Sequence, residues 1–495
     1  MKFKLKSDKN KEIFYRILAL GMITILAFLF SLQCSSHIWK TSTSSTDSSV
    51  FTYVARVILN GGMPYRDVFD HKGPLIYLFD ALGLLISEHF GIWLIELITI
   101  LTGFMIMYKT ARLKCSRLIS LGILLLSCSV LFKYFQWGNL TEEFAIPFIS
   151  AGIYIFTDYF LNGHITKLRL IVCGFSFAAV CLLRVNMIPV WIVMCIGVLV
   201  HSIWKHQAKD LIFFLAFFLL GFVILTLPII VWLAVNNSFE MFIDNYIVFN
   251  QQYSSFDTAV AALAARGSVF MAFFNETVVL LAFALQVYQT VKSKNFFDIL
   301  YVAYFLTNMI FLSLSGHLFW HYGMIIVPSL IYPFANFYSA YHNWKKSSSK
   351  VLSLIFLYVV VTLAMPSWLS GADSAFQDLA VKDTDQTDAD ALAIAELVLQ
   401  NSSPDDQILV CGNWNIIYNI CDRFACTKYA YQSPPITIDE NIAEDYYREI
   451  SQNLPKVIVY INDMPGNEEV MKLIKTNRYK KAGKNAAGNI TVYVR

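Results

Sequence analysis

Hydrophobic residues occur in long, nearly uninterrupted runs over the first three quarters of the chain. A helix needs about 20 mostly apolar residues to cross the roughly 30 Å hydrocarbon core of a membrane. Eleven runs predict eleven spans, at 13–32, 91–108, 118–135, 144–161, 170–183, 185–204, 211–235, 267–290, 296–315, 322–341 and 351–369. A further run, 74–87, is short and contains Asp80, so we expect an interfacial or re-entrant helix there.

The charge of the polar segments between these runs predicts their orientation. Lys and Arg collect in short cytoplasmic loops. With the N-terminus inside, every inside segment is basic, namely 2–11, 109–117, 167–169, 205–209, 292–294 and 345–350. A full span at 74–87 would turn 109–117 and the later basic loops outward. The basic start before the first run also fits a cleaved signal peptide, but we favour a retained helix because many spans follow.

The remaining segments face outward in this topology. The first of them, 33–90, contains a helix-start signal before an apolar-periodic stretch, which predicts a short surface helix over 48–59. The polar tail alternates helix-like stretches (388–401, 467–477) with short apolar runs typical of buried strands (406–412, 455–461), and 479–494 reads as a hairpin. We therefore predict a mainly α, polytopic membrane bundle over 1–369 and a small extracytoplasmic α/β domain over 370–495.

Composition agrees with a membrane protein. The chain is 57% hydrophobic and 15% charged, whereas soluble domains are about 25% charged. A net charge of +3 is too small to indicate a nucleic-acid partner. The nine cysteines are scattered, without CxxC or Cys/His ligand spacing, so they predict neither a disulfide framework nor a metal site.

Charged residues gather in the outer segments, most densely in YRDVFDHKGP at 65–74. Arg66, Lys72, Arg184 and Arg266 break the positive-inside pattern, and such charges usually have a local partner or ligand. An outward-facing transferase lacks cytoplasmic nucleotide-activated donors, but a sugar on a polyprenyl phosphate is available there. Its site needs Lys or Arg for the phosphate and a carboxylate or His for the acceptor hydroxyl. Simple helix capping also explains Asp47, and a solvated interfacial loop also explains 65–74.

Several motifs occur in an order that resembles the multi-spanning C-type glycosyltransferases, which include the protein O-mannosyltransferases and the bacterial enzymes that move aminoarabinose onto lipid A. They are an Asp in the first outer loop, HKGPL at 71–75, GNLTEEFAIP at 138–147 and GHLFWHYGMIIVPSLIYPFA at 316–335. The run 405–431 is similar to the outer domain of bacterial members. Relatives more often show two prolines in the second motif, where this chain has Gly73.

The resemblance implies that Asp47 is the catalytic base and that Lys72 contacts the lipid phosphate. Topology and charge add further candidates on the phosphate side: Arg66, His71, Arg184, His321 and Tyr322. Candidates that orient the acceptor are Asp70, Glu142, Glu143 and His317. A plain surface charge explains Glu142 and Glu143 equally well, and one of the two histidines, His317 or His321, is expected to be structural.

We therefore predict transfer of a single sugar from a polyprenyl-phosphate carrier to a cell-envelope glycan or glycolipid, in a bacterial cell membrane. Inversion at the anomeric carbon needs no general acid because phosphate leaves readily, unlike in the two-carboxylate glycosidases. No cofactor is certain, and Asp47 with Glu142 or Glu143 is the candidate weak divalent-cation site. Alternatives are a polysaccharide polymerase or ligase, a transporter, for which Glu96 and Glu276 are the evidence, and a scaffold.

Overall fold

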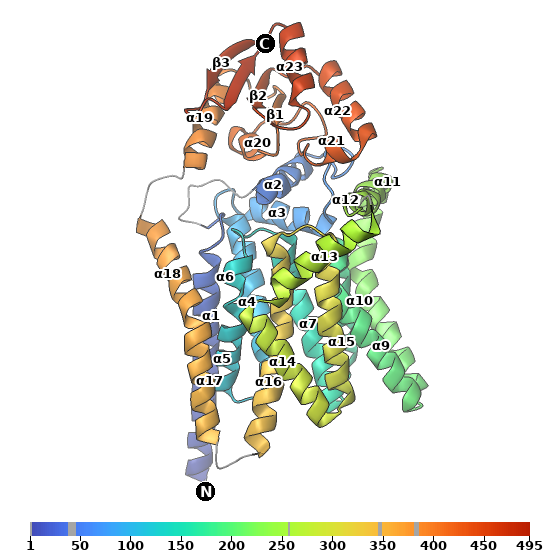
Figure 1. Cartoon of the computed structure of the whole chain (residues 1–495), viewed down its shortest axis with the longest axis vertical. Coiled ribbons are helices and arrows are strands. Elements are labelled where there is room, and N and C mark those ends of the chain that lie inside the picture. The colour runs from blue at the N-terminus through green and yellow to red at the C-terminus, as the bar shows by residue number, and fades with distance from the viewer. Residues whose placement is uncertain (1, 38–45, 256–257, 345–348, 381–385) are drawn as a thin grey trace.

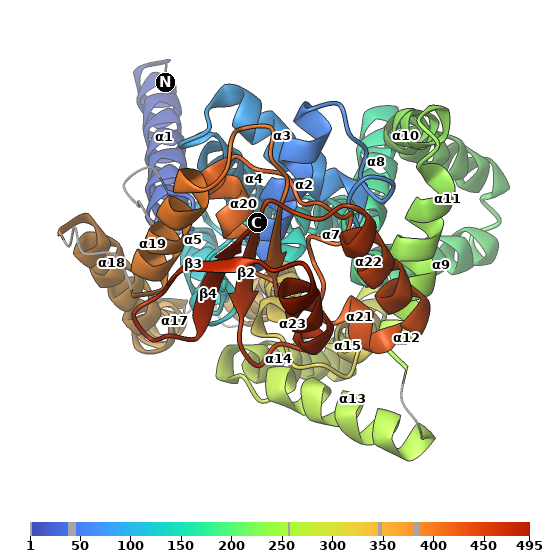
Figure 2. The same ribbon diagram turned by 90° about the horizontal axis from the view of Figure 1, so that it is seen from above.

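The computed structural model describes residues 2–37, 46–255, 258–344, 349–380 and 386–495. It shows a tall helical body below a small α/β domain of residues 386–495, which we call the outer domain because it lies at one end of the molecule (Figure 1). The two ends of the chain lie at opposite ends of the molecule. Seen from above, the outer domain covers the middle of the body, including α2 and α7 (Figure 2).

The body consists of helices that run mostly along its long axis (Figure 1). They are α1 (Lys2–Ser31), α4 (Gly91–Arg112), α5 (Arg117–Cys128), α6 (Leu131–Tyr134), α7 (Thr141–Asn162), α8 (Lys167–Leu183), α9 (Pro189–Trp204), α10 (Ala208–Val235), α13 (Ala259–Phe274), α14 (Thr277–Ser293), α15 (Phe296–Ser313), α16 (Val327–Trp344), α17 (Ser349–Leu363) and α18 (Met365–Ala380). Among the described residues, six helices are long and apolar enough to cross a membrane, or up to eight if each bent pair is one span. The chain is thus a multi-pass membrane protein, while the number of eleven spans stays a prediction.

One of the predicted spans, 267–290, is not a single helix in the structure. The run 267–290 forms α13 and α14, which meet at 88°. The polar residues Asn275 and Glu276 separate the two helices, and the Glu276 carboxylate lies 2.6 Å from Lys133 Nζ. A charge placed at this junction and paired there interrupts the helix that hydropathy alone predicts.

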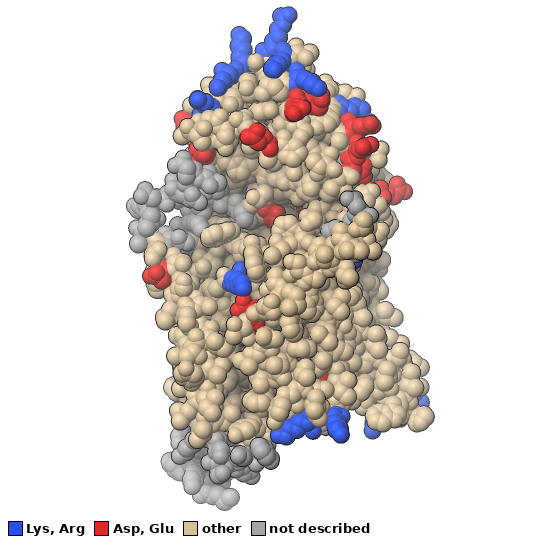
Figure 3. Space-filling model, viewed as in Figure 1, with Lys and Arg blue, Asp and Glu red and all other residues tan. Residues whose placement is uncertain are grey.

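The charge distribution on the surface fits a membrane-spanning body. On the face shown in Figure 3, a broad, nearly uncharged band separates basic residues at the lower end from charged residues on the outer domain. Side chains that face lipid must be apolar because the bilayer core solvates charge poorly. The inward orientation of the N-terminus stays a prediction.

Two short helices lie at the top of the body, beneath the outer domain (Figure 1). They are α2 (Thr46–Leu59) and α3 (Pro74–Ile86), at the positions that the sequence predicts. Pro74 occupies the first turn of α3, where its missing N–H costs nothing. Gly73 precedes it and packs against α8, since a Cβ there would lie 2.0 Å from Leu182 O. This close approach leaves no room for a side chain at position 73.

Short helical segments complete the top of the body: η1 (Val185–Met187), α11 (Phe239–Phe242), η2 (Ile243–Val248), α12 (Phe249–Tyr253) and η3 (Trp320–Ile326). The outer domain contains α19 (Gln386–Gln400), β1 (Ile408–Cys411), α20 (Ile416–Cys421), α21 (Pro435–Ile438), α22 (Glu440–Gln452), β2 (Val457–Ile461), α23 (Asn467–Thr476), β3 (Lys480–Lys484) and β4 (Ile490–Val494). Its sheet has the order β1-β2-β4-β3, with β1 and β2 parallel and the other pairs antiparallel. The strands and helices expected in the tail all occur, and α18 runs across the predicted boundary at 369/370.

The outer domain is bound to the segments that carry the candidate residues. Ala425 N donates to Tyr53 Oη over 2.9 Å, and Asn419 Nδ2 donates to Ser49 O over 2.9 Å. Phe69 N donates to Lys428 O over 2.7 Å. Because α2 and the loop 60–73 are held between two packed layers, several of their polar side chains are buried, among them Ser48, Ser49, Asp70 and His71.

Candidate active site

Charged side chains, together with two histidines and a tyrosine, converge from five segments beneath the outer domain. We call them the charged cluster: Asp47 in α2, Asp70, His71 and Lys72 in the loop 60–73, Glu142 at the start of α7, Arg184 after α8, and His321 and Tyr322 in η3. The sequence predicts each of them as a site residue, although they span 276 positions from Asp47 to Tyr322.

The loop 60–73 is folded tightly around its one tyrosine, Tyr65. Tyr65 N donates to Val68 O over 2.8 Å, and Tyr65 Oη donates to Lys72 O over 2.7 Å. Gly73 N donates to Leu183 O over 3.1 Å. These contacts fix the backbone of Lys72 just before α3.

Asp70 is a buried carboxylate with two donors. Its Oδ2 accepts from Tyr77 Oη over 2.7 Å, and its Oδ1 accepts from His71 N over 2.7 Å. Burial raises the pKa of Asp70, and the Lys72 charge is the strongest opposing influence. Asp70 thus serves as the anionic partner within the loop.

His71 is also buried, in an aromatic surrounding. Its Nε2 lies 2.8 Å from Lys72 Nζ, and Asn250 Nδ2 donates to its carbonyl oxygen over 2.7 Å. The imidazole packs against Phe249 and against Tyr253 and Tyr431, at ring-centroid distances of 5.4, 5.9 and 5.7 Å. Burial lowers the pKa of His71 well below its ordinary value, and the Lys72 and Arg184 charges lower it further. The ring is therefore neutral near pH 7.

Arg184, which is partly buried, forms an ion pair with the buried Glu142 carboxylate. The guanidinium also lies 4.0 Å above the ring centroid of Tyr322. Burial opposes the charge on Arg184, but Tyr322 and Glu142 outweigh it, so the pKa of Arg184 is raised. Glu142 and Glu143 are 2% and 0% exposed, which excludes the alternative that they are plain surface charges.

Asp47 lies in the first turn of α2, where the helix dipole also favours an acidic side chain. Its charge acts on Asp70, Tyr253, His321 and Tyr431. The Lys72 charge also acts on Asp70 and His321. Asp47 and Lys72 are therefore placed around the same two buried groups.

His321 closes the cluster on the side of η3. Its Nδ1 lies 2.7 Å from Gln136 Oε1. Burial lowers the pKa of His321, while the carboxylates of Glu142 and Asp47 act in the opposite direction. Sequence motifs singled out His321, but nothing in the pattern identified Gln136 as its partner.

Two of the predicted site residues have their described contacts elsewhere. Arg66 is engaged by the Asp67 carboxylate, with Nη2 at 2.7 Å from Oδ2, and its Nη1 donates to Asn236 O over 2.7 Å. The hydrogen bond from Arg66 lowers the pKa of Asp67. His317 packs on Tyr253 with ring centroids 4.8 Å apart, so it borders the cluster through that tyrosine.

Glu143 belongs to a second polar group, which we call the amide network: Ser48, Asp80, Glu96, Asn139 and Glu143. Asn139 N donates to Glu96 Oε1 over 2.5 Å and to Glu143 Oε2 over 2.8 Å. Asn139 Nδ2 donates to Asp80 Oδ2 over 3.0 Å and to Ser48 Oγ over 2.9 Å. Since Ser48 follows Asp47, this network fixes the turn of α2 that carries the candidate base.

The loop before α7 is strained. Gln136, Trp137, Gly138 and Asn139 all have positive φ, at 45°, 77°, 76° and 51°. Non-glycine residues rarely adopt this conformation, and strain of this kind persists only where the surroundings enforce it. Here Ser35 N donates to Trp137 O over 2.7 Å, and the two carboxylates hold the Asn139 amide.

One group of potential metal ligands occurs within the described part of the chain. The ligand atoms of Cys34, Glu96 and Glu143 all lie within 4.8 Å of one another and are buried. The predicted weak cation site differs, because it combined Asp47 with Glu142 or Glu143. Arg184 engages Glu142, and Glu143 is turned toward Glu96. The cation site that combines Asp47 with one of these two glutamates stays a prediction.

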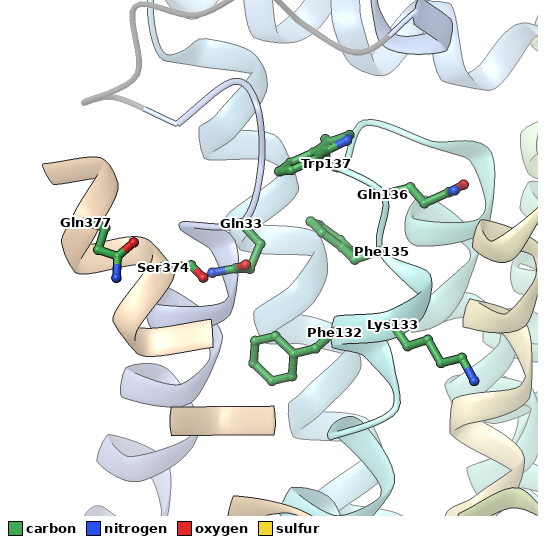
Figure 4. Close-up of a pocket in the computed structure, with 8 residues that line it drawn as sticks. All are labelled: Gln33, Phe132, Lys133, Phe135, Gln136, Trp137, Ser374 and Gln377. Carbon is green, nitrogen blue, oxygen red and sulfur yellow. The ribbon is translucent and has the colours of Figure 1, made fainter. Parts of the chain in front are cut away.

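A cavity of about 540 Å³ opens beside the site, between the end of α1, the segment after α5 and α18. Figure 4 shows polar Gln33, Gln136 and Ser374 around it together with aromatic Phe132, Phe135 and Trp137. Gln136 lines the cavity and also contacts His321, so the cavity adjoins the charged cluster.

Solved structures with a similar fold include C-type glycosyltransferases. ArnT from Cupriavidus metallidurans, bound to undecaprenyl phosphate, has a TM-score of 0.61 at 11% identity and covers 97% of both chains. Its apo form has a TM-score of 0.61 at 10% identity, covering 98% of both chains. The archaeal oligosaccharyltransferase AglB from Archaeoglobus fulgidus, in complex with an inhibitory peptide and a dolichol-phosphate, has a TM-score of 0.50 at 11% identity, covering 91% of this chain and 69% of that one.

The resemblance inferred from the motifs is therefore confirmed at the level of the fold, which is that of the C-type glycosyltransferases. Residues 8–351 match the family described as "Putative competence-induced protein Ccs4 N-terminal domain". The chain belongs to this family. A search by sequence among curated proteins finds no match.

Proposed function

We propose that the chain is a glycosyltransferase that moves one sugar from a polyprenyl-phosphate carrier to a cell-envelope glycan or glycolipid. One observation carries the proposal: an acid, Asp47, and a cation, Lys72, act on the same buried groups beneath the outer domain, in a C-type glycosyltransferase fold. The lipid phosphates named with ArnT and AglB support the class of donor.

Lys72 and Arg184 are assigned to the donor phosphate. An ammonium provides three N–H donors and a guanidinium provides five, so both retain donors after their contacts within the protein. Glu142 and Tyr322 hold the Arg184 guanidinium in place, which reduces the entropy lost when it binds an anion. His321 and Tyr322 border the same position.

Asp47 is assigned as the general base. Its carboxylate takes the proton of the acceptor hydroxyl, and the resulting oxygen nucleophile forms a bond to the anomeric carbon. The bond between that carbon and the phosphate oxygen breaks, and the electron pair leaves with the phosphate. The configuration inverts, and the phosphate remains beside Lys72 and Arg184.

We assign different roles to the helical body and to the outer domain. Residues 1–369 would form the catalytic membrane domain, and residues 370–495 would form an extracytoplasmic domain that covers the acceptor side. Tyr431 supports this arrangement, because it reaches from the outer domain to pack against His71. Transfer of an oligosaccharide, as in a polymerase or ligase, is the competing outcome that the donor assay distinguishes.

The test compares Asp47→Asn with wild type in lipid nanodiscs, supplied with polyprenyl-phosphate sugars and envelope extracts. We expect transfer to fall about 10²- to 10⁴-fold, which is the usual contribution of a general base. Asp244→Asn is the matched control, since Asp244 is an exposed acid of another outer segment. Mass spectrometry of the products identifies the sugar, and undiminished transfer by the Asp47 variant would overturn the assignment.

A further inference from the structure

The contact between His71 and Lys72 determines how both side chains are used. An ammonium carries only donors, so at 2.8 Å the His71 Nε2 must be the acceptor. A neutral imidazole that accepts at Nε2 carries its proton on Nδ1. That nitrogen lies 3.5 Å from Asp70 Oδ1, and the carboxylate favours a proton on the facing side.

We propose that His71 is a positioning residue, which holds the Lys72 ammonium at the place where the donor phosphate binds, and does not contact the phosphate itself. This inference rests on the proposed function. The order of contacts is Tyr77 to Asp70, Asp70 to His71, and His71 to Lys72. One of the three N–H donors of Lys72 is used by His71, which leaves two for the phosphate oxygens.

The surroundings of His71 suit this role. His71 is only 4% exposed, and its ring packs against Phe249, Tyr253 and Tyr431, which restricts the rotation of the imidazole. The charged and titratable groups that face it are Asp70 and Lys72 from its own loop, Arg184 from the end of α8, Tyr253 from α12 and Tyr431 from the outer domain. Two of these are cations, so protonation of the ring is unfavourable near pH 7.

A pH dependence follows from this arrangement. The pKa of His71 is lowered from the ordinary 6.5, so the ring accepts its proton only at pH values below that. A protonated imidazole has no acceptor for Lys72 and repels it. Binding of a lipid phosphate should therefore weaken as the pH falls, by more than protonation of the phosphate alone explains.

Three substitutions distinguish the role of Nε2 as a hydrogen-bond acceptor from the packing of the imidazole ring. His71→Phe keeps an aromatic ring for packing but removes Nε2. His71→Gln keeps an oxygen acceptor and cannot be protonated, and Lys72→Ala removes the cation. We expect His71→Phe to weaken binding of undecaprenyl phosphate about tenfold, as for a lost hydrogen bond to a charged group. His71→Gln should stay within about threefold of wild type and lose the additional weakening at low pH.

A double-mutant cycle in nanodiscs tests whether His71 acts through Lys72. If it does, His71→Phe adds nothing in the Lys72→Ala background. Melting temperatures check that each variant folds. Equal effects of His71→Phe with and without Lys72 would overturn the inference while leaving the proposed donor intact. A wild-type protein that binds no undecaprenyl phosphate would instead overturn the proposed function, and the inference with it.

Discussion

Glu142 and Glu143 are neighbours in the chain and are both buried, yet they belong to two regions that treat charge differently. Glu142 lies in the charged cluster and is paired with Arg184. Glu143 lies in the amide network, where the Asn139 N–H donates to it and to Glu96. One region holds full charges close to the outer domain, and the other binds carboxylates with neutral donors. The comparison shows that two adjacent acids can have different roles. Glu142 belongs to the candidate active site, and Glu143 helps to hold the structure around it.

The largest effect is expected where a full charge would lose its partner. Arg184→Ala leaves the Glu142 carboxylate buried without a cation, which typically costs about 3–5 kcal/mol in free energy of unfolding. Thermal unfolding in nanodiscs measures this loss. The double variant Arg184→Ala, Glu142→Ala removes the stranded charge and should recover much of the stability, but not binding of undecaprenyl phosphate. If both variants are equally unstable, the pair does not act as a charge pair.

The second effect concerns the support region. Asn139→Ala removes two donors, to Asp80 and Ser48, and places alanine at a φ of 51°. Each unsatisfied buried group costs about 1–3 kcal/mol, and alanine tolerates this backbone less well than asparagine. We expect a loss of stability together with reduced transfer, because Ser48 adjoins Asp47. The readouts are the melting temperature and the transfer rate.

Asn139→Gly is the matched control for that substitution. It relieves the backbone conformation but still lacks the amide, so it isolates the two hydrogen bonds. If the glycine variant behaves like wild type, the amide has no part in holding α2.

Much of the fold could be predicted from the sequence because hydropathy and turn signals are local. The short helices at 48–59 and 74–87 and the strands of the tail follow from such signals, and the ordered motifs led to Asp47 and Lys72. The break in 267–290 was missed because Glu276 is stabilised there by Lys133, which lies 143 positions away. A hydropathy average depends only on the residues within the run, so it contains no information on Lys133.

The residues that contact the candidate site residues could not be predicted from the sequence either, because these contacts also join distant parts of the chain. Tyr253, Tyr431 and Gln136 contact the charged cluster from three separate segments, and no local pattern links them to it. From the sequence alone, Arg66 and Lys72 cannot be told apart, because both are basic residues of the same loop. Only the structure shows that Arg66 contacts Asp67 and Asn236, whereas Lys72 contacts His71.

The smallest expected effect is that of Glu143→Gln. A glutamine side-chain oxygen can still accept from Asn139 N, and the substitution removes one of two neighbouring buried carboxyls, so stability should change by less than about 1 kcal/mol. Glu142→Gln changes the same atoms one position earlier, but it removes the counter-charge of the partly buried Arg184 guanidinium and should be clearly destabilising. Melting temperatures and transfer rates of this matched pair, measured side by side, give the contrast. Equal losses in the two variants would show that the chain treats both acids alike, and that the charged cluster and the amide network are one continuous site.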